Sequence, residues 1–108
     1  MAVFAKKAET YAAFQYPSSS DYQSRINIYT ADNYRLYVLF YDDDATLPSN
    51  SYNNKTGVAY EHASRYAAYL DLLRHEDPVW VTFNEEAKSF VVYAAYEPVG
   101  EAEMMAAA

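Results

Sequence analysis

The 108-residue chain contains no cysteine, only two glycines, Gly57 and Gly100, and few basic residues. The absence of cysteine excludes a disulfide scaffold, thiolate chemistry and zinc bound by cysteine. The two distant glycines exclude the dinucleotide-binding fingerprint and the P-loop, because both need glycines a few residues apart. No G-x-S-x-G or H-E-x-x-H sequence occurs either, so the motifs of serine hydrolases and zinc proteases are absent.

The charge balance restricts the classes of partner. Eight basic side chains stand against 15 acidic ones, which gives a formal net charge of −7. A protein that binds the phosphate backbone of nucleic acid, or an anionic membrane, needs a basic footprint. We therefore expect no nucleic acid and no membrane as the main partner, whereas a basic protein would suit this charge.

The chain shows no targeting or membrane segment. Its uninterrupted apolar runs, such as 36–41 and 90–96, are far too short to cross a bilayer. The apolar residues near the start precede Lys6 and Lys7, which reverses the order found in a secretory signal peptide. Together with the absence of cysteine, this predicts a cytoplasmic location.

Aromatic residues supply much of the apolar content. There are 13 tyrosines, 5 phenylalanines and 1 tryptophan, and each ring can bury about 150–250 Å². This is enough for one core, and we expect a single domain over 1–100 followed by a flexible tail over 101–108. Because a tyrosine hydroxyl needs a partner or water, such a composition favours half-exposed surfaces.

Alternation over 25–30, and apolar stretches bounded by turn residues or proline, predict strands at about 9–16, 25–30, 34–41, 79–84 and 89–96. Turn residues at 31–33 and 85–88 join the last four of these strands into two hairpins. Between the hairpins, apolar residues at spacings of four and three predict one amphipathic helix over 58–76. The apolar stripe of this helix consists of Ala59, Ala63, Tyr66, Leu70 and Leu73.

The predicted order, β-β-β-α-β-β, indicates an α+β domain. In this fold about five strands form an antiparallel sheet, and the amphipathic helix packs on one face. Side chains alternate between the faces of a strand. The face toward the helix then carries Ile26, Ile28, Leu36, Val38, Phe40, Val79, Val81, Phe83, Phe90 and Val92. The other face carries Tyr29, Tyr37, Leu39, Tyr41, Trp80, Val91 and Tyr93.

A single helix cannot cover both of these apolar faces. Seven large apolar side chains would exceed the apolar patch of a few hundred Å² that a monomer usually exposes. The cover could be the N-terminal segment with Phe4 and Phe14, the loop 42–57 with Tyr52, a second copy of the chain, or a ligand. Because tyrosine and tryptophan are enriched at interfaces, the seven residues are the candidate interface of a homo-oligomer.

A second candidate site surrounds His62. On the predicted helix this residue borders the apolar stripe, close to Tyr66 and Tyr69, so the three could line a pocket with a general base. The ordinary alternative is a half-buried histidine bonded to a tyrosine hydroxyl. The acidic run 42–44 lacks the spacing of a calcium loop, and it suits a solvated strand end. We identify no catalytic residue, metal site or cofactor.

Three functional hypotheses follow, and the sequence leans against an enzyme. The first is a small acidic binding or structural module that self-associates through the tyrosine-rich sheet face. The second is an acidic inhibitor of the immunity type that docks a basic partner, although no motif matches that class. The third is a small ligand-binding protein or enzyme that uses His62 and the neighbouring tyrosines.

Overall fold

The computed structural model of the protein describes residues 2–17 and 21–94. The predicted tail, 101–108, lies outside the described residues. The elements are β1 (Val3–Gln15), β2 (Ser24–Thr30), β3 (Arg35–Tyr41), β4 (Ser51–Asn53), β5 (Thr56–His62), a 3₁₀ turn (Ala63–Arg65), α1 (Tyr66–His75), β6 (Val79–Asn84) and β7 (Ser89–Ala94).

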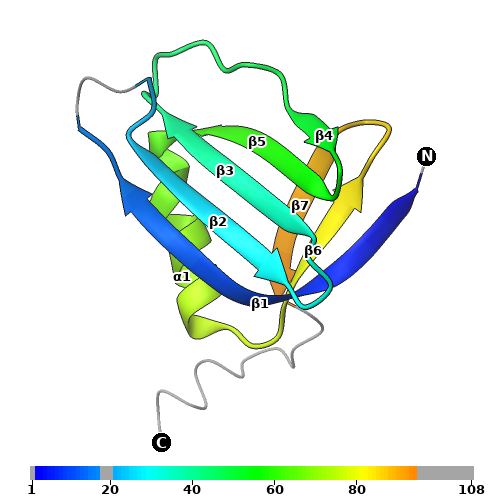
Figure 1. The fold of residues 1–108 in the computed structure, drawn as a ribbon. Coiled ribbons are helices and arrows are strands. Elements are labelled where there is room, and N and C mark those ends of the chain that lie inside the picture. Colours follow the sequence, from blue (N-terminus) through cyan, green and yellow to red (C-terminus); the bar gives the residue numbers. More distant parts are fainter. Residues whose placement is uncertain (1, 18–20, 95–108) are drawn as a thin grey trace, which may run out of the picture.

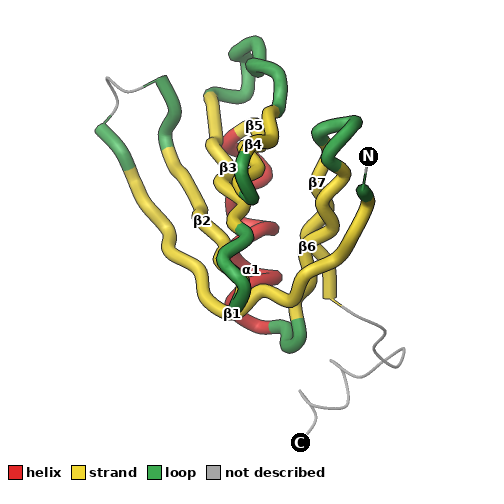
Figure 2. The backbone as a smooth tube through the Cα atoms, turned by 45° about the vertical axis from the view of Figure 1, so that its right-hand side comes forward, coloured by secondary structure: helices red, strands yellow, loops and turns green. Residues whose placement is uncertain are grey.

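Within the described residues, seven strands form one sheet in the order β4-β5-β3-β2-β1-β6-β7. The pair β3–β5 is parallel, and all other neighbours are antiparallel. The sheet curls into a half-barrel, with β6 and β7 behind β2, β3 and β5 in Figure 1. The short helix α1 lies on the inner side of the curl, as the turned view in Figure 2 also shows.

The predicted fold class is therefore wrong in strand number, in strand direction and in helix length. The sheet is mixed and has seven strands, whereas we predicted about five antiparallel strands under a long helix. The first part of the predicted helix, 58–62, is strand, and α1 covers only Tyr66–His75. The prediction failed because Ala59 fits an apolar helical stripe and an inward strand position equally well.

The start of β5 carries the signal that the helix prediction overlooked. Asn54 and Lys55 both have positive φ, 51° and 64°. Two such residues form the tight turn that suits the twist of a hairpin, and here they join β4 to β5. Thr56, Val58 and Tyr60 then alternate with smaller residues, and these three residue types favour strand over helix.

The curl depends on β1, which takes part in both halves of the sheet. Its first part, Val3 to Lys7, pairs with β6, and its second part pairs with β2. The register shifts between Ala8 and Thr10. An extra residue of this kind bends a strand and increases its twist. The bend turns β6 and β7 back toward the inner face of β2 and β3.

The predicted inner face is the core. Eight of its members form one cluster of buried residues or lie buried beside it. These eight are Ile26, Ile28, Leu36, Val38, Phe40, Val79, Val81 and Phe83. The helix packs on Phe40, whose ring lies edge-on to Tyr66 at 5.1 Å and to Tyr69 at 5.5 Å between centroids. Local alternation thus predicted the inward side chains correctly, although it missed the topology.

Candidate functional site

The outer face of β1, β2, β3 and β5 is the side turned to the viewer in Figure 1, away from α1. Strand register arranges its side chains in three rows from β1 to β5. The rows are Phe14–Arg25–Leu39–Tyr60, Ala12–Asn27–Tyr37–Val58 and Thr10–Tyr29–Arg35–Thr56. We call these twelve residues, with the neighbouring Tyr41, the outer face.

Aromatic rings form a continuous strip along one end of the outer face. Tyr16 lies 6.4 Å from Phe14 and 5.0 Å from Tyr22, measured between ring centroids. Tyr41 continues the strip, at 5.9 Å from Tyr22 and 5.7 Å from Tyr60. Because each such contact stabilises by about 0.5–1.5 kcal/mol, the rings hold one another in place. They also cover one another, which leaves the tyrosines half-buried rather than singly exposed.

Arg25 lies among these rings. Its guanidinium carbon is 5.0 Å from the centroid of Phe14 and 5.6 Å from that of Tyr37. A cation over an aromatic face at such distances gains about 0.5–1 kcal/mol at exposed sites and more when it is desolvated. The Nε atom of Arg25 is buried and has no hydrogen-bond partner among the described residues.

Asn27 is buried although it lies on the outer face, with only 4% of its surface exposed. Its Nδ2 donates a hydrogen bond of 3.0 Å to the hydroxyl of Tyr29. Its Oδ1 is buried without a partner within the described part of the chain. Leaving such a group unpaired costs about 1–3 kcal/mol. The packing that buries Asn27 therefore leaves one of its hydrogen-bond acceptors unpaired, which lowers the stability of the fold.

The charge of the outer face differs from that of the whole protein. The chain carries a net charge of −7, yet the three rows contain Arg25 and Arg35 and no carboxylate. Tyrosine and arginine are enriched in the cores of protein interfaces, and aspartate and glutamate are depleted there. The outer face thus has the composition of an interface core on an acidic molecule.

The structure divides the predicted interface residues into two groups. Tyr29, Tyr37, Leu39 and Tyr41 share the outer face, where Tyr29 and Tyr37 are in edge contact at 6.5 Å. Trp80, Val91 and Tyr93 lie on the outward side of β6 and β7. Because the sheet curls so that the two inner sides face a common core, these outward sides point in different directions.

Sequence reasoning missed Tyr60, which the helix prediction over 58–76 hid. Phe14 was named only as a possible cover for this face. Its contact with Arg25 depends on the pairing of β1 with β2. A reading of 56–62 as a strand, on the basis of its alternation, would have found Tyr60.

The residues proposed for a pocket do not share one surface. His62 lies at the end of β5, with its Nε2 at 3.0 Å from the carbonyl oxygen of Ala45. This contact holds the 42–50 loop against the sheet. Tyr66 packs edge-on against the buried Phe40. Of the three residues, Tyr69 alone lines one of the two cavities described below.

Tyr69 is half-buried, and its phenol is paired with an acidic side chain. Its hydroxyl donates a hydrogen bond of 2.9 Å to Oε2 of Glu61. Burial, and then the negative charge of Glu61, raise the pKa of Tyr69 well above its ordinary value. A phenol that holds its proton this firmly is a hydrogen-bond donor at neutral pH and is a poor general base.

Two cavities of about 300 Å³ each flank the helix. The first lies between α1, β5 and β7, and its lining includes Glu61, Arg65, Tyr69, Leu72, Phe90 and Val92. The second lies between β1 and the end of α1, and its lining includes Glu9, Tyr11, Leu73, Glu76 and Asp77.

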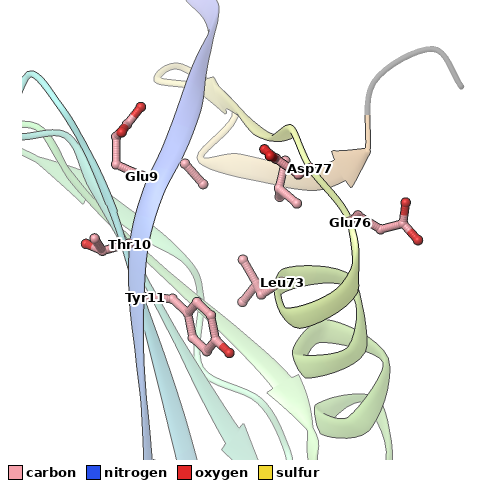
Figure 3. Close-up of a pocket in the computed structure, with 8 residues that line it drawn as sticks. Glu9, Thr10, Tyr11, Leu73, Glu76 and Asp77 are labelled. Carbon is pink, nitrogen blue, oxygen red and sulfur yellow. The ribbon is translucent and has the colours of Figure 1, made fainter.

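The second cavity is acidic but does not resemble a metal site. In Figure 3, Tyr11 and Leu73 approach each other across it, while Glu9 and Glu76 point away from each other. No group of three or more metal-ligating side chains occurs in residues 2–17 and 21–94. The cavity therefore offers scattered negative charge rather than a coordination sphere.

Comparisons of the chain with protein families, with curated proteins and with solved structures find no match. No helix in the described part of the chain is long and apolar enough to cross a bilayer.

Proposed function

We propose that this protein is a small, non-catalytic binding or structural module that self-associates through its outer face. The observation that carries the proposal is a half-exposed aromatic strip combined with two arginines and no carboxylate, on a chain of net charge −7. In Figure 1 no helix or strand lies in front of this face. The Phe4 and Tyr52 rings, which could have covered it, pack instead against Phe83 in the core.

A second copy is the partner that suits this face. In a contact with two-fold symmetry the same patch meets itself, so a patch without carboxylates brings no acidic repulsion into the contact. The acidic residues of both copies would stay at the rim or on other surfaces. Arg25, already held between Phe14 and Tyr37, would lie against the rings of the second copy, where a desolvated cation–π contact is stronger.

The substitution Tyr37→Arg tests the proposal. Tyr37 lies in the middle row of the outer face, and Tyr37→Arg would remove its ring from the contact and add a further uncompensated charge from each copy. The matched control is Tyr11→Arg, because Tyr11 is exposed (37%) and lies on the side of β1 that faces α1. Circular dichroism would establish that both variants fold.

The measurement is the mass in solution, by size-exclusion chromatography with light scattering, up to several hundred micromolar. We expect the wild type to be larger than a monomer, and Tyr37→Arg to weaken the association by about thirtyfold or more, the effect of losing one central interface residue. Tyr11→Arg should behave as the wild type does. A monomeric wild type, or a folded Tyr37→Arg variant with unchanged mass, would contradict the proposal.

A further inference from the structure

The two edges of the curled sheet are protected to very different degrees. At one edge, β4 has only three residues, and the N–H of Tyr60 beyond it donates to Oδ1 of Asn50 at 3.1 Å. At the other edge, β7 has six residues, Ser-Phe-Val-Val-Tyr-Ala, without charge or proline. Proteins usually blunt an edge with a charge, a proline, a bulge or a very short strand. The described part of β7 uses none of these.

The hydrogen bonds around β6 indicate which groups of β7 face outward. The N–H of Glu85 donates to the carbonyl oxygen of Ala2 at 3.1 Å, which continues the ladder between β6 and β1. In an antiparallel ladder, bonded and non-bonded residue pairs alternate. Phe83 and Val81 therefore direct their backbone N–H and C=O groups toward β1, as Glu85 does.

The alternation continues into β7. Since Phe83 and Val81 bond to β1, Thr82 and Trp80 must bond to their partners in β7, which are Val91 and Tyr93. The remaining residues of β7 then direct their backbone groups to the open edge. These are Phe90, Val92 and Ala94.

Among the described residues, no strand pairs with β7 on this side. The cavity of about 300 Å³ between α1, β5 and β7 borders Phe90 and Val92. Val91, on the outward side of the same strand, is 56% exposed. In the described part of the chain β7 has one strand neighbour, β6, so the backbone groups of Phe90 and Val92 on its other side have no ladder partner there. An incoming strand would therefore find backbone donors and acceptors that pair with no described strand, next to the cavity.

We propose that β7 is a second self-association surface, at which β7 of another copy pairs in antiparallel fashion and joins two sheets into one. This surface is distinct from the outer face and does not depend on it. A second copy is the fitting occupant because β7 is uncharged, so two molecules of net charge −7 meet there without direct charge repulsion. Antiparallel pairing of identical strands also satisfies two-fold symmetry.

A two-fold axis at Val92 gives a consistent register. The N–H and C=O groups of Val92 bond to those of the partner's Val92, and the side chain of Val91 lies beside the partner's Tyr93 on the outward side. Pairs of a β-branched and an aromatic residue stabilise antiparallel strands. Phe90 lies opposite the partner's Ala94, so a large side chain meets a small one.

The test combines substitutions at both surfaces. Val91→Lys places a charge on the exposed side of the edge, which is a natural means of preventing strand pairing. Its matched control is Val3→Lys, because Val3 is similarly exposed (63%) but lies on β1. Val92→Pro removes an N–H that the hairpin with β6 does not use and that the proposed contact needs. Val92→Ala controls for the lost side chain.

Light scattering over a concentration series distinguishes the two surfaces. We expect the mass of the wild type to rise above that of a dimer with concentration. The single variants Tyr37→Arg and Val91→Lys should each reach the mass of a dimer and no more, and the double variant should have the mass of a monomer. Val3→Lys should match the wild type. In the Tyr37→Arg background, Val92→Pro should weaken the dimer by at least about tenfold more than Val92→Ala, because two inter-strand hydrogen bonds are lost.

The possible failures are separable. If Tyr37→Arg has no effect and Val91→Lys alone gives a monomer, the β7 surface stands and the outer-face proposal falls. If Tyr37→Arg alone gives a monomer, or if Val91→Lys and Val92→Pro leave the Tyr37→Arg dimer intact, the β7 proposal is overturned. A wild type that remains a monomer at all concentrations overturns both.

Discussion

A close contact between β5 and β7 yields a quantitative prediction for Gly57→Ala. Gly57 is buried on the inner side of β5, opposite Leu36. A Cβ atom at this position would lie 2.6 Å from Cε1 and 2.7 Å from Cζ of Phe90, and 3.2 Å from Cδ1 of Leu36. The first two distances are too short for carbon atoms in contact. The ring of Phe90 must therefore move when alanine replaces glycine.

Two opposing effects set the magnitude. Alanine favours a strand over glycine by about 0.5–1 kcal/mol, because glycine loses more conformational freedom on folding. Overpacking a tight site costs about 1–3 kcal/mol. Leu36 is 1% exposed and cannot yield, whereas half-buried Phe90 can swing outward at the loss of part of its packing. We expect overpacking to prevail, with a net destabilisation of about 1–2 kcal/mol.

Urea unfolding followed by the fluorescence of Trp80, the single tryptophan, measures this change. With a slope of about 1–3 kcal/mol per molar urea for a small protein, the midpoint should fall by roughly 0.5–1 M. All variants are compared at one protein concentration, because self-association would raise the apparent stability.

The control is the same substitution in a Phe90→Leu background. Leucine lacks the ring atoms that the new Cβ would meet, so Gly57→Ala should cost much less there, and the double-mutant cycle should show coupling. The reasoning fails if Gly57→Ala raises the midpoint in the wild type. It also fails if the effects of the two substitutions are additive.

Two further predictions concern pH and the core. Burial raises the pKa of Tyr52 to about 12, and burial with Glu61 raises that of Tyr69 further. The two phenols thus lose their protons at a higher pH in the folded state than in the unfolded state. These groups therefore leave stability unchanged below about pH 10, and stability falls as the pH rises above it. In the wild type the urea midpoint should therefore fall from about pH 8 to about pH 11, and in Tyr69→Phe it should fall less. An unchanged fall would contradict the raised pKa of Tyr69. Phe40→Ala should lower the free energy of unfolding by about 3–5 kcal/mol and weaken the packing of α1, because Phe40 is fully buried against Tyr66. Urea unfolding measures the first effect and circular dichroism the second. A loss under about 1 kcal/mol would refute this account of the core.

Local patterns in the sequence predicted part of the fold well. The second hairpin strand 79–84 has the predicted bounds, and 25–30 and 34–41 each differ from β2 and β3 by one residue at the start. These segments are rich in β-branched and aromatic residues and are bounded by turn residues, so a short window contains the whole signal. The failure over 58–62 has an equally local cause, since a helical and a strand period both fit its small and aromatic residues.

The candidate site was predicted only in part. The outward positions of Tyr29, Tyr37, Leu39 and Tyr41 followed from the period of two. The contribution of Tyr60 could not be foreseen, because it requires β5 to lie parallel to β3. Parallel neighbours need a long connection, and no feature of the intervening 42–50 segment shows where that connection leads.

The amino-acid sequence alone determined which side chains of each strand share a face, because side-chain alternation is a property of the extended backbone itself. It also determined that the chain is acidic, rich in tyrosine and free of cysteine. The tertiary structure alone decided that Tyr37 and Trp80 face different directions. That separation results from the bend in β1 near Glu9 and from strand pairings between distant segments, and a periodic pattern within one strand contains no information about how far the whole sheet curls.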